Sequence, residues 1–75
     1  MNLTQQELET IEKLAGLFYT PKQIAIILEI DPEMFEAHIR SETGNTYRAY
    51  YKGYYEADIE LRKSITQSAL SGSSP

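Results

Sequence analysis

Few side chains in this 75-residue sequence have the types and spacing that catalysis or metal binding requires. His38 is the only histidine and there is no cysteine, so thiolate metal sites are excluded and a histidine-based site cannot be built. No glycine-rich phosphate loop is present. No serine, carboxylate or second histidine is arranged in the sequence to make His38 a catalytic base. We therefore expect a protein that is not an enzyme and holds no metal or cofactor.

The basic residues instead point to binding, and their distribution is uneven. The net charge is −4 and the isoelectric point is about 4.8. Residues 1–45 hold eight acids and three bases, whereas residues 46–75 hold three acids and four bases. Attraction to nucleic acid must therefore come from the second part or from local patches. The low isoelectric point argues against strong non-specific DNA binding by a monomer.

Three helix-start signals divide residues 1–45. Thr4 and Thr20 each begin a capping box, with Glu7 and Gln23 three residues further on. Asp31 is a carboxylate cap followed by a proline that suits the first helical position. Together with the apolar spacing, these signals predict helices over residues 5–18, 21–29 and 32–41. The predicted fold class is all-α.

A fourth, much longer helix is predicted from Thr46 to about Ser71, because only Gly53 interrupts the helical pattern. Such a helix is about 38 Å long, so its first half packs on the three short helices and its second half projects. Asp58 is expected to pair with a tyrosine hydroxyl or with Arg62. One stripe carries Tyr47, Tyr50, Tyr51, Tyr54, Ala57, Leu61, Ile65 and Ala69. An apolar stripe that projects requires a partner helix, so the predicted oligomer or partner interface comprises Tyr54, Ala57, Leu61, Ile65 and Ala69.

The spacing between the second and third helices predicts a helix-turn-helix. Ala25 is the small residue of the second helix over which the third helix can cross, and Glu29 stands where the turn often has glycine. The apolar residues expected around the turn and on the inner face are Leu28, Ile30, Phe35 and Ile39. The sequence thus divides into a three-helix unit, residues 1–45, and a tyrosine-rich helix, residues 46–75. Because Gly72 resembles a helix stop and Ser73-Ser74-Pro75 a new helix start, we expect a further helix to follow.

The third helix would enter the major groove of DNA if the unit is a DNA reader. Its outward residues include Glu33 and Glu36, which meet phosphates unfavourably, and Arg40, whose fork can read guanine. The candidate DNA-binding residues are Lys22, Met34, Ala37, His38, Arg40, Arg48 and Lys52. In the alternative interpretation the helix pair is a scaffold or protein-binding module. The bases of the long helix are then a solvated face interleaved with Glu56 and Glu60.

The order of these features resembles the N-terminal region of small terminase subunits from tailed phages and prophages. The first part of the resemblance lies in Thr20-Pro21-Lys22-Gln23-Ile24-Ala25, continuing through Leu28 to Ile30-Asp31. The second lies in Tyr54-Tyr55-Glu56, Leu61-Arg62-Lys63-Ser64 and the junction from Ala69 to Pro75. The resemblance implies recognition of viral double-stranded DNA, assembly into a homo-oligomer, and contact with a large terminase subunit. The acidic third helix departs from a strong DNA reader.

Two other functions fit the same residues. One is an acidic helical module for protein interaction or oligomerisation, and the other is the helix-turn-helix domain of a transcription regulator. No apolar run approaches the roughly 20 residues of a membrane span, and the N-terminus lacks the features of a signal peptide. We expect a protein of the cytoplasm, in a bacterial host cell if the resemblance holds.

Overall fold

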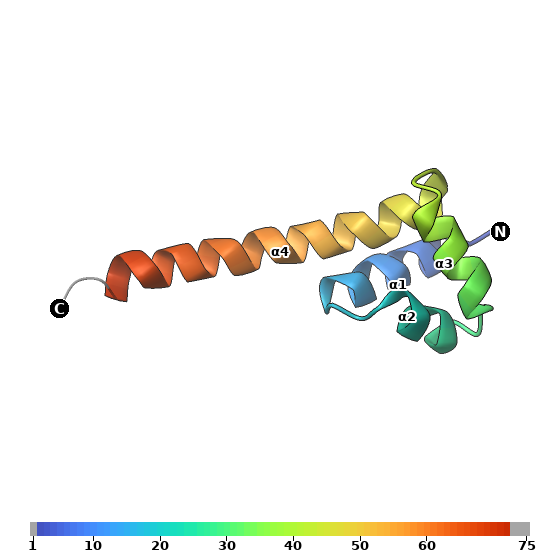
Figure 1. Ribbon diagram of the computed structural model, residues 1–75, viewed down its shortest axis with the longest axis horizontal. Coiled ribbons are helices and arrows are strands. Elements are labelled where there is room, and N and C mark those ends of the chain that lie inside the picture. Colours follow the sequence, from blue (N-terminus) through green and yellow to red (C-terminus); the bar gives the residue numbers. More distant parts are fainter. Residues whose placement is uncertain (1, 73–75) are drawn as a thin grey trace.

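The computed structural model describes residues 2–72 of the chain, and side chains within residues 2–65. Residues 2–72 form four helices and no strand, which confirms the all-α prediction. The helices are α1 (Gln5–Gly16), α2 (Pro21–Ile27), α3 (Pro32–Arg40) and α4 (Gly44–Gly72). Figure 1 shows the three short helices gathered against the first half of α4, while its second half extends away from them.

The predicted helix starts are confirmed by their hydrogen bonds. The Glu7 amide donates to Thr4 Oγ1 at 3.1 Å, and the Thr4 amide donates back to Glu7 Oε1 at 2.9 Å. Thr20 and Gln23 repeat this reciprocal box at the start of α2. Asp31 caps α3 by accepting from the Glu33 amide at 3.2 Å. Each cap satisfies amides that have no partner within the helix.

The end of the first helix differs from the prediction, because α1 stops at Gly16 rather than at Phe18. Phe18 has a left-handed backbone, with φ of 66°. Its amide donates to the Ala15 carbonyl, and the Tyr19 amide donates to the Leu14 carbonyl. This pair of bonds is a Schellman motif, which satisfies the last carbonyls of the helix and turns the chain away.

The α2–α3 turn repeats that motif: α2 ends at Ile27, two residues before the predicted end, and the turn residue is Glu29, as expected. Glu29 occupies the position where glycine is common and has φ of 58°. The Glu29 amide donates to the Ile26 carbonyl at 3.2 Å, and the Ile30 amide donates to the Ala25 carbonyl at 2.8 Å. A non-glycine residue in this region costs backbone free energy, so the packing of the flanking helices has to hold the turn in place.

The start of α4 also differs slightly from the prediction. The helix begins at Gly44, two residues before Thr46, and the preceding Glu42 is left-handed, with φ of 57°. Gly44 itself has φ of 85°, a conformation that glycine adopts without steric cost. The α3–α4 connection is consequently only three residues long, Ser41 to Thr43.

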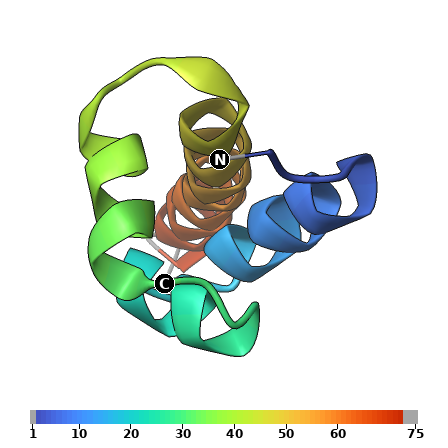
Figure 2. The ribbon, with the colours of Figure 1, turned by 90° about the vertical axis from the view of Figure 1, so that its right-hand side faces the viewer.

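The core lies where the three short helices meet the first half of α4. Figure 2 looks along α4 and shows α1 on one side of that half and α3 on the other. In this view α2 lies between them at the bottom. Phe35 and Ile39 of α3 are buried, as predicted. Tyr50 is buried too, and its burial, with Tyr51 and Tyr54 beside it, raises the pKa of its hydroxyl. The other buried apolar residues are Ile11, Ala15, Ile24 and Ala25.

The backbones of α1 and α4 approach closely where the two helices pack at Gly53. A Cβ placed on Gly53 would overlap the Glu12 carbonyl oxygen and lie 2.7 Å from the Glu12 carbonyl carbon. A Cβ on Gly16 would instead lie 3.4 Å from the Gly53 carbonyl oxygen, an ordinary contact. Gly53 is therefore the residue that lets the two backbones touch, and α1 forms the most extensive helix contact of α4.

Replacing Gly53 by alanine is expected to destabilise the fold by about 3 kcal/mol, because the backbones must separate to admit the methyl group. In an exposed helix the same change would stabilise by about 1 kcal/mol. Urea unfolding followed by circular dichroism measures the difference. Gly16→Ala is the matched control and should change the free energy of unfolding by less than about 0.5 kcal/mol. A Gly53→Ala variant as stable as the parent would contradict the crossing.

Replacing Glu29 by glycine is expected to stabilise the protein by about 1 kcal/mol, since glycine removes the steric cost of the left-handed turn. Glu29→Ala keeps the Cβ and should give no such gain. The same urea titration compares the two variants. Equal stabilisation by both would show that the lost negative charge, and not the backbone, is responsible.

Candidate nucleic-acid and assembly surfaces

Four of the candidate DNA-binding residues lie on the outward face of α3 or beside it. Met34, Ala37 and Arg40 on α3 are exposed, and so is Lys22 at the start of α2. Arg40 Nη1 lies 3.8 Å from Glu36 Oε2, one helical turn earlier. The guanidinium that could read a base is thus partly neutralised by a carboxylate of its own helix.

Lys22 has acidic surroundings as well. A shallow hollow between the starts of α2 and α3 is lined by Lys22, Pro32 and three carboxylate residues, namely Asp31, Glu33 and Glu36. One ammonium group among three carboxylates leaves this side of the helix pair negative. Phosphates would be repelled here unless cations or a neighbouring basic group intervene.

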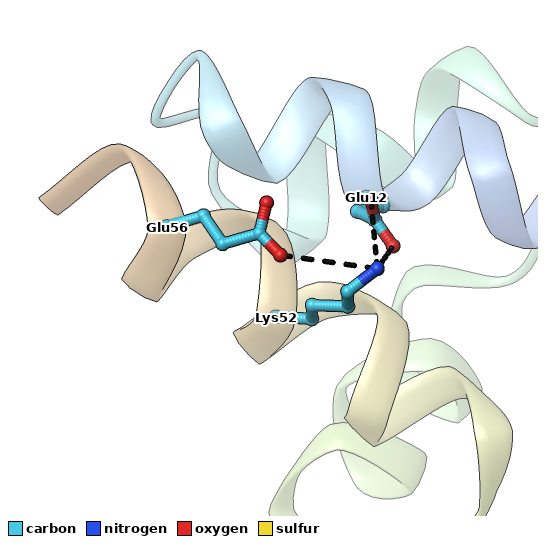
Figure 3. A network of polar contacts seen from close by, with 3 residues as sticks. All are labelled: Glu12, Lys52 and Glu56. Carbon is cyan, nitrogen blue, oxygen red and sulfur yellow. Dashed lines mark hydrogen bonds and ion pairs between the residues drawn. The ribbon is translucent and has the colours of Figure 1, made fainter. Parts of the chain in front are cut away.

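Arg48 and Lys52 lie elsewhere, along the groove between α1 and α4. The groove is lined by Gln5, Leu8, Glu9, Glu12, Asn45, Arg48, Ala49 and Lys52. Lys52 Nζ lies 3.3 Å from Glu12 Oε1 and 3.8 Å from Glu56 Oε1, so two carboxylates share one ammonium group (Figure 3). Arg48 is exposed and belongs to none of the ion pairs found within residues 2–65.

His38 is half-buried on the side of α3 that faces the start of α4. It lines a cavity together with residues of the α3–α4 connection and of the N-terminal segment. The predicted DNA-binding residues therefore do not form one patch. Lys22, Met34, Ala37 and Arg40 belong to the α2–α3 face, Arg48 and Lys52 to the α1–α4 groove, and His38 to the cavity.

The bases further along α4 are also paired. Arg62 Nε donates to Asp58 Oδ2 at 2.9 Å, which confirms one of the two partners predicted for Asp58. This hydrogen bond and the charge of Asp58 raise the pKa of the Arg62 guanidinium. Lys63 Nζ lies 3.7 Å from Glu60 Oε1. Because these pairs are exposed, they add little stability, but they leave this face nearly neutral, as the solvated-face interpretation expects.

The projecting half of α4 leaves its apolar stripe uncovered. Within the described side chains, Leu61 is 49 % exposed and Ile65 is 59 % exposed, whereas Tyr54 and Ala57 are half-buried against the body. Ala69, the last predicted interface residue, lies outside the residues whose side chains are described. Exposed leucine and isoleucine one turn apart form a surface that water solvates poorly.

The turn after α1 extends this apolar surface, and sequence reasoning missed it. Leu17 is 61 % exposed, and Phe18 and Tyr19 are exposed beside it. Phe18 contacts Tyr54 edge-to-face, with ring centroids 5.4 Å apart, which joins the turn to the α4 stripe. The rim of the adjoining hollow is acidic and includes Glu9, Glu12, Glu56 and Glu60. The available signal was three consecutive large apolar residues just before the second capping box.

Two further kinds of site are not formed by the described residues. Within residues 2–72, no helix combines the length and the apolar character that crossing a bilayer requires. No group of three or more histidine, cysteine, aspartate and glutamate side chains gathers there as metal ligands would.

Comparisons of the chain with family models, with curated proteins and with solved structures found no match. The function therefore has to be argued from the surfaces themselves.

Proposed function

We propose that the chain is a non-enzymatic DNA-binding and assembly module of the small terminase subunit type. In this proposal α2 and α3 form a helix-turn-helix, and the projecting half of α4 joins copies of the chain. The observation that carries the proposal is the α2–α3 pair with an uncovered outer face on α3. Double-stranded DNA and a large terminase subunit are the partners that the resemblance implies.

Three features of the α2–α3 pair support a helix-turn-helix. Ala25 is fully buried, so the two helices can approach closely at that point. Glu29 makes the tight left-handed turn between them. Phe35 and Ile39 fix α3 to the core and leave Met34, Ala37 and Arg40 facing outward. This is the combination that lets a helix enter a major groove.

An exposed apolar surface on α4 and on the turn after α1 supports assembly. The stripe of Leu61 and Ile65 is exposed, and the turn of Leu17 to Tyr19 enlarges it. Assembly would also compensate for the weak charge of a single copy, because an oligomer presents several α3 faces to one duplex and the weak contacts act together. A single copy, with its acidic hollow beside Lys22, is expected to bind DNA weakly.

A second candidate function is an acidic protein-interaction module. It is favoured by the three carboxylates around Lys22 and by the pairing of Lys52, Arg62 and Lys63 with carboxylates. In that case the α2–α3 face would bind a basic protein surface and not DNA.

A fluorescein-labelled duplex of about 20 base pairs distinguishes these functions by fluorescence anisotropy. Binding is expected at low salt. The logarithm of the binding constant should fall linearly with the logarithm of the sodium chloride concentration. Arg40→Ala should weaken binding by about 1 kcal/mol or more, roughly five-fold. Arg62→Ala removes the same charge from the projecting half and is the control, with a smaller effect expected.

Glu36→Gln sharpens the same test. It removes the carboxylate beside Arg40 and should strengthen duplex binding, because the guanidinium is released and one repulsive charge is lost. No binding at 25 mM salt would reject the DNA proposal. Equal losses from Arg40→Ala and Arg62→Ala would assign the binding to general charge and not to α3.

The assembly proposal is tested by sedimentation velocity as a function of protein concentration. Leu61→Glu together with Ile65→Glu should abolish association, because four charges in two copies would enter an apolar contact. Ile59→Glu is the matched control, since Ile59 is equally exposed but lies outside the stripe. A parent chain that stays monomeric at several hundred micromolar would contradict this proposal for the present chain.

A further inference from the structure

The cavity beside His38 differs in chemistry from the other hollows described above. It is lined by Asn2, Leu3, Leu8, His38, Thr43, Gly44, Asn45 and Thr46. None of these residues is acidic, whereas the α1–α4 groove, the hollow at Leu17 and the hollow at Lys22 each contain at least two carboxylate residues. In a chain of net charge −4, a polar cavity lined without carboxylates is the place where an anion meets the least repulsion.

The cavity lies at the N-terminus of α4, which spans 29 residues. The first amides of a helix have no carbonyl partner within it, and the helix dipole places partial positive charge there. At α1, α2 and α3 a threonine or aspartate oxygen accepts from one of these amides. Within residues 2–65, no such side-chain bond is formed with the amides of Gly44, Asn45 or Thr46.

Thr46 supplies a second and independent indication. Among the polar residues whose side chains are described, Thr46 is the buried one, with only 6 % of its surface exposed. Its hydroxyl forms no hydrogen bond within residues 2–65. In the same residues, every side-chain oxygen that is fully enclosed has a hydrogen-bond partner. The hydroxyl oxygen is therefore not fully enclosed, and Thr46 is one of the residues that line the cavity. A threonine hydroxyl that reaches a polar cavity can donate to a ligand oxygen.

Basic and polar groups border the same opening. His38 lines the cavity, and an imidazole has a ring N–H that can donate. Asn45 and Leu8 line both this cavity and the α1–α4 groove, so the two adjoin. Arg48, which no carboxylate pairs within residues 2–65, lies in that groove one turn along α4. Its guanidinium brings a positive charge near the cavity, in a groove that also holds Glu9 and Glu12.

We propose that this cavity binds one phosphate group. The amides of Gly44 to Thr46 and the Thr46 hydroxyl would donate to the phosphate oxygens, with His38 as a further donor and Arg48 providing charge from the groove. The phosphate belongs either to a nucleic-acid backbone or to a free phosphate ion. The nucleic-acid form rests on the proposed function, and there the site would position the duplex without reading its sequence.

The first test is an NMR titration of the ¹⁵N-labelled chain with sodium phosphate at constant ionic strength. Saturable shifts are expected in the amides of Gly44, Asn45 and Thr46. Thr46→Val removes the hydroxyl but keeps the shape, and should weaken phosphate binding about five-fold, the loss of one hydrogen bond. Thr10→Val is the matched control, since the Thr10 hydroxyl donates to the Gln6 carbonyl on α1 and faces no candidate site.

His38→Ala gives a second variant should Thr46→Val not fold, because His38 is only half-buried. It should also weaken phosphate binding. The absence of saturable shifts at residues 44–46 would overturn the proposal, and so would equal effects of Thr46→Val and Thr10→Val.

The duplex assay then identifies the source of the phosphate. Weaker duplex binding by Thr46→Val assigns the cavity to the nucleic-acid backbone, whereas unchanged duplex binding assigns it to a free phosphate ion. Phosphate binding in a chain that binds no duplex would support the cavity and reject the proposed DNA function. Duplex binding without any phosphate-induced shift would support the DNA function and reject the phosphate cavity.

Discussion

The rest of the structure depends on the contact between two helix backbones at Gly53. Because glycine has no side chain there, the Glu12 segment of α1 lies directly against α4. The contact joins the first helix of the chain to the last and fixes the direction in which α4 leaves the body. It also brings Glu12 within reach of Lys52, so the ion pair in Figure 3 follows from the backbone packing and does not cause it. Exposed pairs of this kind contribute little stability.

Most of the basic residues lie next to a carboxylate that offsets their charge. Arg40, Lys52, Arg62 and Lys63 each have a carboxylate within 4 Å. A ligand that uses one of these bases has to displace that carboxylate or tolerate its charge. The start of α4 is different, because no carboxylate lines the cavity there. Arg48 lies in the adjoining groove with Glu9 and Glu12 but forms an ion pair with neither. The lining of the cavity at the start of α4 is therefore less acidic than the hollow beside Lys22 at the outer face of α3.

Local features of the fold were predictable from sequence. Capping boxes need only residues three apart, so Thr4 and Thr20 located two helix starts without any tertiary information. The left-handed Glu29 followed from the spacing of its apolar neighbours. The end of α1 was not predictable in this way, because Phe18 has a suitable type and spacing for a helix. The Schellman turn and the contact with Tyr54 determine its conformation instead.

Features of the candidate sites that join distant residues could not be predicted. Lys52 pairs with Glu12 across forty residues, and only the crossing at Gly53 sets that distance. In the sequence, Gly53 was merely an interruption in a helical pattern. The cavity at the start of α4 was hidden for the same reason, since it combines α3, α4 and the N-terminal segment. His38 was singled out by residue type alone, and Thr46 gave no signal before its burial was known.

The single uninterrupted run of α4 also sets how its backbone amides exchange with solvent. The amides beside Tyr50 and Gly53 are covered by the body, so their exchange requires the core to open. The amides between residues 57 and 65 depend on helix propagation alone, and they can open without disturbing the core. We therefore expect one helix to show two classes of hydrogen exchange, with the boundary near Ala57. Any partner that docks on the projecting half would move that boundary along the helix, and the protected length of α4 would report how far the contact extends.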